Sequence, residues 1–235
     1  MATSKVFEGE QTILFIGKTG SGKSRLINLL AQEKIAESRQ SIVATTMKCQ
    51  LHSVRLNEIL YRLIDTPGFG DSELSQDEVS EQMRELSQLN VQNINWVVVI
   101  LNGSIRLTKE TATILQNIFS FLNLSTYKDH VLFCITHADG WNEQAKLRYL
   151  AQLNENPVYQ IYPDDSAEKF VFIGAPDPDE RDSKDKELYV AMEEEARNTL
   201  LENLSYIKAF NLQDAITKWQ EADTRNKRGH RVKEE

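Results

Sequence analysis

The sequence predicts an α/β fold of three layers, in which a mostly parallel sheet is flanked by helices and a long helix lies near the C-terminus. Short apolar runs alternate along the chain with segments whose apolar residues recur every three or four positions. This alternation is typical of parallel strands joined by helices. The 235 residues, 40% of them hydrophobic, can bury a sizeable core, and we find neither an internal repeat nor a clear second domain.

Six apolar runs are the predicted strands. They span residues 12–16, 49–56, 59–64, 96–101, 131–135 and 169–173. Helical periodicity predicts helices over residues 23–33, 77–89, 109–123 and 143–153. The predicted last helix has an apolar stripe at Tyr189, Met192, Ala196, Leu200, Leu204 and Ile207, with Leu212, Ile216 and Trp219 as a candidate continuation. We expect this helix to pack onto the domain, and a partner-binding helix is the alternative.

A glycine-rich octamer directly follows the first predicted strand. Residues 17–24 read Gly-Lys-Thr-Gly-Ser-Gly-Lys-Ser, a full match to G-x-x-x-x-G-K-[S/T]. Glycines permit the positive φ angles and close approach with which backbone N–H groups surround a phosphate chain. Lys23 would neutralise β- and γ-phosphate charge, and the Ser24 hydroxyl would bind Mg²⁺. The remaining candidate nucleotide contacts are Gly17, Lys18, Thr19, Gly20, Ser21, Gly22 and Arg25. The alternative is an ordinary strand-to-helix turn.

A second motif, Asp65-Thr66-Pro67-Gly68, ends the third predicted strand. Ligands of open α/β sheets lie beyond the carboxyl ends of the strands, so we expect Asp65 beside the glycine-rich loop. There its carboxylate can hold Mg²⁺ through water. The N–H of Gly68 could approach the γ-phosphate, and loss of that phosphate would release residues 69–74. On its own, the same tetrapeptide would form a plain turn.

A third motif, Thr136-His137-Ala138-Asp139, follows the fifth predicted strand. The Asp139 carboxylate can accept hydrogen bonds from N1–H and the exocyclic amino group of guanine, which adenine cannot offer. His137 could lie against the face of the base, or it could be a loop histidine without ligand contact. Asp139 could instead cap the following helix. After the last predicted strand, Gly174 and Ala175 could offer a backbone N–H to guanine O6.

The order of these motifs resembles the immunity-associated (AIG-type, GIMAP) GTPases, in the septin and chloroplast-import-receptor (Toc) branch. The resemblance covers roughly residues 10–210 and includes Thr46-x-x-Cys49 and the box Ile105-Arg106-Leu107-Thr108-Lys109-Glu110. It implies the three-layer P-loop GTPase fold and a GTP-binding and hydrolysing molecular switch, with GTP or GDP and Mg²⁺ as cofactors. It also implies that the switch forms a nucleotide-dependent homodimer through its nucleotide face.

The resemblance carries two further residues over by position. Thr46 matches the mobile-loop threonine that meets Mg²⁺ and the γ-phosphate, with Thr45 as its competitor. Arg106 matches an arginine that can reach the phosphates of a partner subunit, where it could raise the rate about 10³- to 10⁵-fold. A solvated arginine is the alternative. Lys23, Thr46, Gly68 and Arg106 are therefore the candidate catalytic residues.

The sequence also bears on the mechanism of GTP hydrolysis and on alternative functions of the protein. Phe69 rather than glutamine follows the second motif, so no obvious side chain polarises the attacking water. We therefore predict slow hydrolysis by the monomer and faster turnover on self-association. The competing hypotheses are a nucleotide-controlled scaffold or membrane coat with marginal hydrolysis, and an ATP-dependent phosphotransferase.

Composition limits the partners and the compartment. The net charge of -8 argues against a nucleic-acid partner. Cys49 and Cys134 lie in predicted strands, which favours buried free thiols over a disulfide. No apolar stretch approaches the length of a membrane span, so we expect a cytoplasmic protein. The basic cluster within residues 225–233 is read as a solvated end, with contact to an acidic membrane or partner as the alternative.

The predicted organisation has three parts. Residues 1–10 form an N-terminal extension and residues 11–210 the AIG-type guanine-nucleotide-binding domain. Residues 211–235 form a helical continuation and the basic tail.

Overall fold

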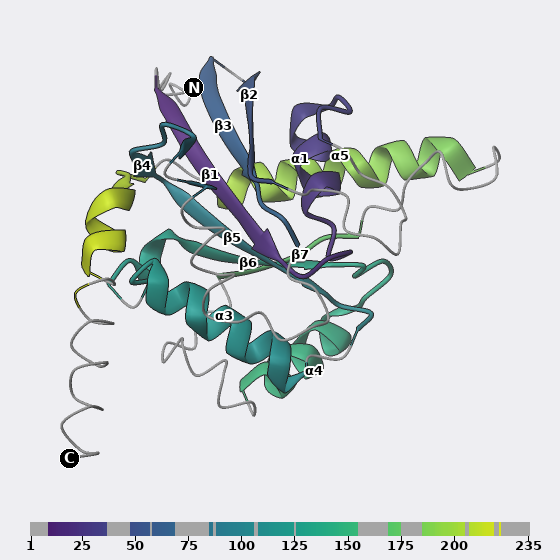
Figure 1. Cartoon of the computed structure of the whole chain (residues 1–235). Helices are drawn as coiled ribbons and strands as arrows, with labels where there is room; N and C mark the ends of the chain where they lie inside the picture. Colours follow the sequence, from purple (N-terminus) through teal and green to yellow (C-terminus); the bar gives the residue numbers. More distant parts are fainter. Residues whose placement is uncertain are drawn as a thin grey trace, which may run out of the picture.

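A six-stranded sheet forms the centre of the computed structural model (Figure 1). The structure describes residues 9–36, 48–56, 58–68, 85–86, 88–105, 108–124, 126–154, 169–174, 185–204, 207–218 and 221. The strand order is β2-β3-β1-β5-β6-β7. The strands are β1 (Glu10–Gly17), β2 (Gln50–Leu56), β3 (Ile59–Asp65), β5 (Trp96–Asn102), β6 (Val131–Thr136) and β7 (Phe170–Phe172). Only the β2–β3 pair is antiparallel within this sheet, which confirms the predicted mostly parallel arrangement.

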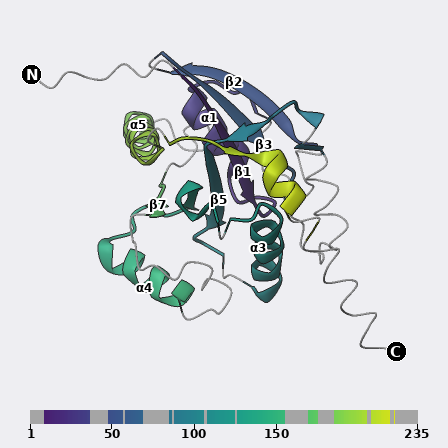
Figure 2. The same cartoon turned by 90° about the vertical axis from the view of Figure 1, so that its left-hand side faces the viewer.

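Helices cover both faces of the sheet and complete the three predicted layers. Helices α1 (Lys23–Ala31) and α5 (Lys186–Asn203) lie on one face, and α3 (Lys109–Phe121) and α4 (Glu143–Asn154) lie on the other (Figures 1 and 2). Four predicted helices therefore form within a few residues of their expected bounds. Of the predicted helix over residues 77–89, the structure describes residues 85, 86 and 88 as helical. None of the described helices is both long and apolar enough to cross a bilayer.

The central strands are continuous apolar runs because each of their faces is buried. In β1, Leu14 and Ile16 pack in the cluster that contains the α3 residues, whereas Ile13 and Phe15 pack in the cluster that contains the α1 and α5 residues. Successive side chains of a strand point to opposite faces, and a parallel sheet covered on both faces needs apolar residues at every position. The strands that carry the candidate site are thus fixed from both sides.

The C-terminal region differs from the predicted continuous helix. Helix α5 ends at Asn203, and the chain then forms the short strand β8 (Phe210–Asn211), which pairs with β4 (Asn93–Ile94). Residues 212–218 form a separate helical segment, drawn in yellow in Figure 1. Leu200 and Leu204 belong to the apolar cluster on the α1 side, whereas Phe210, Leu212 and Ile216 belong to the cluster on the α3 side. The apolar residues of the predicted last helix and its continuation therefore keep a helical spacing in the sequence, although the chain passes from the apolar cluster on one face of the sheet to the cluster on the other.

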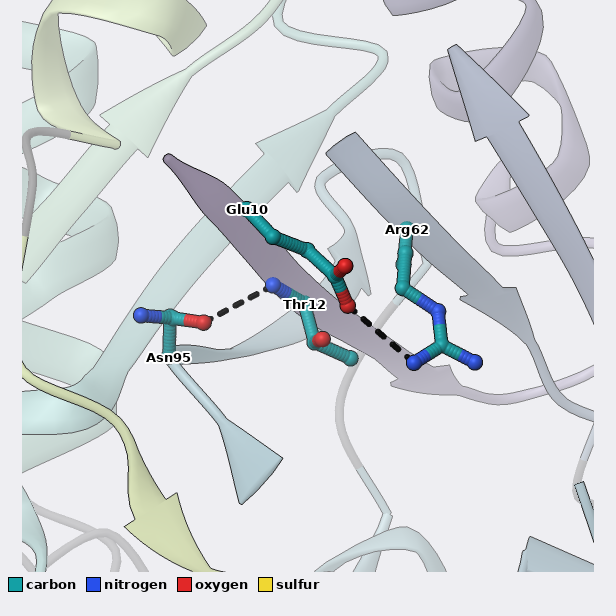
Figure 3. Close-up of polar contacts among 4 residues, drawn as sticks. All are labelled: Glu10, Thr12, Arg62 and Asn95. Carbon is teal, nitrogen blue, oxygen red and sulfur yellow. Dashed lines mark hydrogen bonds and ion pairs between the residues drawn. The ribbon is translucent and has the colours of Figure 1, made fainter. Parts of the chain in front are cut away.

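Asn95, between β4 and β5, anchors this crossing. Its Oδ1 accepts a hydrogen bond from the Thr12 N–H of β1 at 2.8 Å (Figure 3). Its Nδ2 donates to the carbonyl of Ile207 at 2.7 Å. Nearby, Arg62 of β3 pairs with Glu10 of β1 at 3.1 Å, also shown in Figure 3. These contacts lie at the amino end of β1, so they hold the fold without belonging to the candidate site.

Candidate functional site

The glycine-rich octamer forms the loop between β1 and α1. A Cβ on Gly17 would lie 2.5 Å from the carbonyl oxygen of Ile100 in β5, so only glycine fits there. Gly20 and Gly22 have φ angles of +75° and +97°, a conformation that glycine adopts without steric cost. The loop therefore has the close packing and the left-handed residues that its sequence predicted.

Lys23 is the buried cation of this loop. Only 6% of the surface of Lys23 is exposed. Its Nζ donates hydrogen bonds to the carbonyls of Gly17 at 3.0 Å and Lys18 at 3.1 Å. Burial lowers the pKa of the Lys23 ammonium from 10.5 to about 8, although the Asp65 carboxylate acts in the opposite direction. A desolvated ammonium held by loop carbonyls is strongly stabilised when a polyanion takes the place of the lost water.

Two buried hydroxyls in the same loop suit a phosphate. Among the residues that the structure describes, neither Thr19 Oγ1 nor Ser21 Oγ has a hydrogen-bond partner. A buried hydroxyl without a partner is costly, since it has lost its hydrogen bonds to water. Phosphate oxygens could accept from both groups, so these orphaned hydroxyls support a phosphate ligand in the loop.

Two of the three predicted magnesium ligands, Ser24 and Asp65, lie together. The Ser24 hydroxyl, in the first turn of α1, donates to Asp65 Oδ2 at 2.7 Å, and Asp65 is fully buried at the carboxyl end of β3. In the described part of the chain, no group of three or more His, Cys, Asp or Glu side chains forms a metal site by itself. Mg²⁺ uses one or two protein oxygens together with phosphate oxygens and water. The pair of side chains fits that donor set.

The second motif is fixed against the loop at two points. The Thr66 hydroxyl donates to the carbonyl of Phe15 in β1 at 2.8 Å. Two residues later, a Cβ on Gly68 would lie 2.5 Å from Cα and 2.7 Å from N of Thr19. The backbone of Gly68 thus touches the glycine-rich loop.

The third motif is joined to the glycine-rich loop by Thr136. Its hydroxyl, at the end of β6, donates to the carbonyl of Ser21 at 2.8 Å. Its methyl carbon would lie 3.3 Å from a Cβ on Gly22. The end of β6 therefore holds the phosphate loop and the start of the base-recognition segment at a fixed separation. This role of Thr136 could not be predicted from the sequence, because its partner is not close in the chain.

The segments that carry the candidate base-recognition residues Asp139 and Gly174 lie against each other. His137 has φ +56°, and both His137 and Asp139 are exposed. The backbone of Gly174, after β7, meets Asp139, since a Cβ on Gly174 would lie 2.9 Å from Asp139 Cα. Asn142 caps α4, because its Oδ1 accepts from the Ala145 N–H at 2.9 Å. Asp139 is thus not the cap of that helix, and its carboxylate faces solvent.

The remaining candidates are placed differently. Arg25 forms an ion pair with Glu193 of α5. Thr46, Arg106 and Ala175 lie outside the described residues, as does the basic cluster within residues 225–233. The two cysteines are buried and do not form a disulfide, as predicted.

Fold and loop together define the class of protein. A glycine-rich loop after the first strand, a buried lysine, and the Ser24–Asp65 pair at the carboxyl edge of a parallel sheet form a P-loop nucleotide-binding domain of the GTPase fold. The chain belongs to the AIG1 family, whose family model matches residues 11–221. This match confirms the resemblance drawn from the motifs.

Individual relatives agree with the family assignment. Immune-associated nucleotide-binding protein 7 of Arabidopsis thaliana is 30% identical over 134 residues, which are 57% of this chain and 43% of that protein. The chain spans less than half the length of the first three curated relatives that it matches.

Solved structures share the fold. The crystal structure of Toc33 from Arabidopsis thaliana in complex with GDP and Mg²⁺ matches with a TM-score of 0.61 and 15% identity, over 86% of this chain and 88% of that chain. A second structure matches with a TM-score of 0.52 and 16% identity, over 85% of both chains. It was reported with the statement that dimerization is important for the GTPase activity of the chloroplast translocon components atToc33 and psToc159.

Proposed function

We propose that the chain binds GTP with Mg²⁺ and hydrolyses it to GDP and phosphate, and that it acts as a nucleotide-dependent switch. The observation that carries this proposal is the buried Lys23 ammonium, held between two loop carbonyls beside the Ser24–Asp65 pair. Membership of the AIG1 family and a fold shared with a GDP-bound and Mg²⁺-bound protein support it.

In the proposed site, the glycine-rich loop binds the phosphates and the third motif binds the base. Lys23 and the loop N–H groups offset charge that develops on the phosphate oxygens while water attacks in line with the β–γ bond. Mg²⁺ bound to Ser24 and Asp65, with Thr46 as a further ligand, would neutralise charge on the β- and γ-phosphates. Asp139 accepts from the guanine N1–H and 2-amino groups. His137, Gly174 and Ala175 complete the base site.

Calorimetry on nucleotide-free protein tests this function. We expect GDP and a non-hydrolysable GTP analogue to bind with Mg²⁺ and ADP to bind at least about tenfold more weakly, because adenine leaves the Asp139 carboxylate without its donors. Lys23→Ala should weaken guanine nucleotide binding strongly. Lys208→Ala, which changes an exposed lysine near β8, is the matched control. Equal binding of ADP and GDP, or no binding of either, would contradict the proposal.

A homodimer through the nucleotide face is the second part of the proposal. The published statement on atToc33 and psToc159 links dimerization to GTPase activity in those proteins. In this chain, Arg106 would reach across to the partner's phosphates, and the isolated monomer would hydrolyse slowly. Specific activity should therefore rise with protein concentration, and Arg106→Ala should remove that rise. Concentration-independent turnover that Arg106→Ala leaves intact would reject the dimer. Single-turnover assays without any phosphate release would favour a nucleotide-controlled scaffold instead.

A further inference from the structure

The turn that carries Asp139 is closed by the tryptophan that follows it. The backbone N–H of Trp141 donates to the carbonyl of Ala138 at 3.1 Å. Between them, Gly140 has φ +69°, as required at the third position of a turn that favours glycine there. Asp139 therefore occupies the second position of a four-residue turn whose last residue is Trp141. Whatever fixes Trp141 also fixes the direction of this turn.

The indole ring of Trp141 is anchored on three elements. Its centroid lies 5.4 Å from the ring of Tyr149 in α4 and 6.0 Å from the ring of Phe172 in β7. Its Cη2 would lie 3.1 Å from a Cβ on Gly103, just after β5. Stacked and tilted aromatic pairs at these distances are attractive and have defined geometry. The ring therefore contacts residues of α4 and β7 and the segment just after β5.

The same aromatic cluster also fixes the neighbouring loop. Phe172 lies two residues before Gly174, whose backbone meets Asp139. The Ala138 N–H donates to the carbonyl of Ile173 at 3.2 Å, so the two loops are hydrogen-bonded as well. Trp141 and Phe172 are in contact with each other. This aromatic cluster thus helps to position both loops of the candidate base site, the one that carries Asp139 and the one that carries Gly174.

We propose that Trp141 is a positioning residue that determines base specificity at this site. It holds the Asp139 turn so that the carboxylate can accept two hydrogen bonds at once, from guanine N1–H and from the 2-amino group. A single hydrogen bond tolerates rotation of the turn, whereas a two-point contact requires a fixed orientation. Asp139 is exposed beside a glycine, so its own side chain does not fix the turn. Trp141 adds the side-chain anchor to the backbone hydrogen bond between Ala138 and Ile173. The inference rests on the proposed guanine nucleotide binding.

The test compares GDP with inosine 5′-diphosphate (IDP) in the presence of Mg²⁺. IDP retains N1–H and lacks only the 2-amino group, so the ratio of the two dissociation constants reports the second hydrogen bond to Asp139. We expect the wild-type protein to prefer GDP by about tenfold or more. Trp141→Ala should reduce this ratio to below about a third of its wild-type value. Loss of folded protein alone would weaken both nucleotides equally and leave the ratio unchanged.

Two further variants separate positioning from general destabilisation. Trp141→Phe keeps an aromatic ring on Tyr149 and Phe172 and should restore most of the GDP preference, whereas Trp141→Leu should not. Tyr149→Phe keeps the ring and removes a buried hydroxyl that has no hydrogen-bond partner in the described part of the chain, so it should leave the ratio at the wild-type value. If Trp141→Ala does not fold, the Phe and Leu variants carry the comparison.

The outcomes also distinguish this inference from the function on which it rests. If wild-type protein binds GDP and IDP equally, Asp139 does not read the 2-amino group and the proposed base recognition fails. If wild-type protein prefers GDP and Trp141→Ala or Trp141→Leu keeps the full preference, base recognition stands and the role of Trp141 is rejected. A reduced ratio in Trp141→Leu with recovery in Trp141→Phe supports it.

Discussion

The backbone N–H of Cys49 donates to the Glu85 carboxylate at 3.1 Å, which joins the residue before β2 to the helical segment that contains Glu85 and Leu86. Cys49 is buried, and burial together with Glu85 raises the pKa of its thiol to about 12. Cys49 follows the candidate Mg²⁺ ligand Thr46 by three residues, and Glu85 lies in the predicted helix after the second motif. The contact therefore connects the chain segments that follow two of the nucleotide motifs.

Removing the Glu85 carboxylate should destabilise the domain. Glu85→Ala removes the acceptor of this hydrogen bond at a buried residue, which costs about 1 to 3 kcal/mol. Glu85→Gln retains an amide oxygen as acceptor and should cost less. Urea denaturation of both variants measures the difference in the free energy of unfolding. Equal stability of the Ala and Gln variants would show that the hydrogen bond contributes nothing.

The Cys49 thiol should also resist alkylation in the folded protein. With a pKa of about 12, the reactive thiolate is scarce at pH 8, and burial restricts access to it. Mass spectrometry after treatment with iodoacetamide should show almost no modification of native protein and complete modification in denaturant. Rapid labelling of Cys49 without denaturant would contradict the buried arrangement. Cys134 should behave alike, since full burial raises the pKa of its thiol further.

Nucleotide binding should weaken at alkaline pH through Lys23. In the unfolded chain its pKa is 10.5, and burial lowers it to about 8 in the folded protein. Between these two values the unfolded state binds more protons at this residue, so the contribution of Lys23 to the stability of nucleotide-free protein rises with pH there, by up to about 3 kcal/mol. Over the same window the ammonium that binds phosphate is lost. The dissociation constant for GDP should therefore increase above pH 8, by at most about tenfold per pH unit.

The alanine variant provides the control for this pH dependence. Lys23→Ala has no ammonium to lose, so its weaker GDP binding should stay nearly constant from pH 7 to pH 9.5, and its stability should not rise over that range. Calorimetric titrations and denaturation curves at several pH values measure both. An identical pH profile in wild-type protein and Lys23→Ala would assign the titration to another group.

Ser24→Ala should remove most of the Mg²⁺ dependence of nucleotide binding. The Ser24 hydroxyl and Asp65 are 2.7 Å apart, so both can contribute oxygens to one ion. We expect GDP affinity in excess EDTA to remain close to wild type and the gain on adding Mg²⁺ to fall by about tenfold or more. Ser53→Ala, which changes an exposed serine of β2, should retain the full gain. A full Mg²⁺ gain in Ser24→Ala would mean that the ion is bound elsewhere.

The strands and the phosphate loop could be predicted from the sequence because their signals are local. Ile13, Leu14, Phe15 and Ile16 are all buried, so the first strand is a continuous apolar run, and the octamer after it has a fixed spacing. The end of α5 could not be predicted, since Leu204 and Leu212 keep one helical spacing while packing in different cores. Local periodicity does not report which face of the sheet a residue covers.

In the candidate site, too, the residues in local motifs could be predicted from the sequence, whereas contacts between distant segments could not. The candidate ligands Lys23, Ser24 and Asp65 follow from motif spacing and from the rule that ligands lie at the carboxyl edge of the sheet. Thr136 was missed as a link to the loop because its acceptor, the Ser21 carbonyl, is 115 residues away. Trp141 gave no signal, since its aromatic partners come from α4 and β7. Contacts between distant segments require the folded structure.

Substitution of Gly68 should separate GTP from GDP binding. The added methyl group of Gly68→Ala would lie 2.5 Å from Cα of Thr19, so the backbone must move away from the phosphate loop. GDP does not use the Gly68 N–H in the proposed site, whereas the γ-phosphate does. Affinity for a non-hydrolysable GTP analogue should therefore fall about tenfold or more relative to GDP. Gly9→Ala, at an exposed position before β1, is the control, and an unchanged preference in Gly68→Ala would remove Gly68 from the γ-phosphate site.

Asn95 should contribute to stability without affecting nucleotide binding. Asn95→Ala leaves the Thr12 N–H and the Ile207 carbonyl without their partner, and each loss costs about 1 to 3 kcal/mol where the group stays buried. Asn95→Asp keeps an acceptor for Thr12, but it places a carboxylate at a buried position with one oxygen facing the Ile207 carbonyl, so it should not restore wild-type stability. Both contacts lie at the amino end of β1, whereas ligands of open α/β sheets lie beyond the carboxyl ends of the strands. Denaturation should therefore show both variants to be less stable than wild type, while GDP affinity of the folded proteins stays within about twofold. A large loss of GDP affinity in folded Asn95→Asp would show that this end of the sheet is coupled to the nucleotide site.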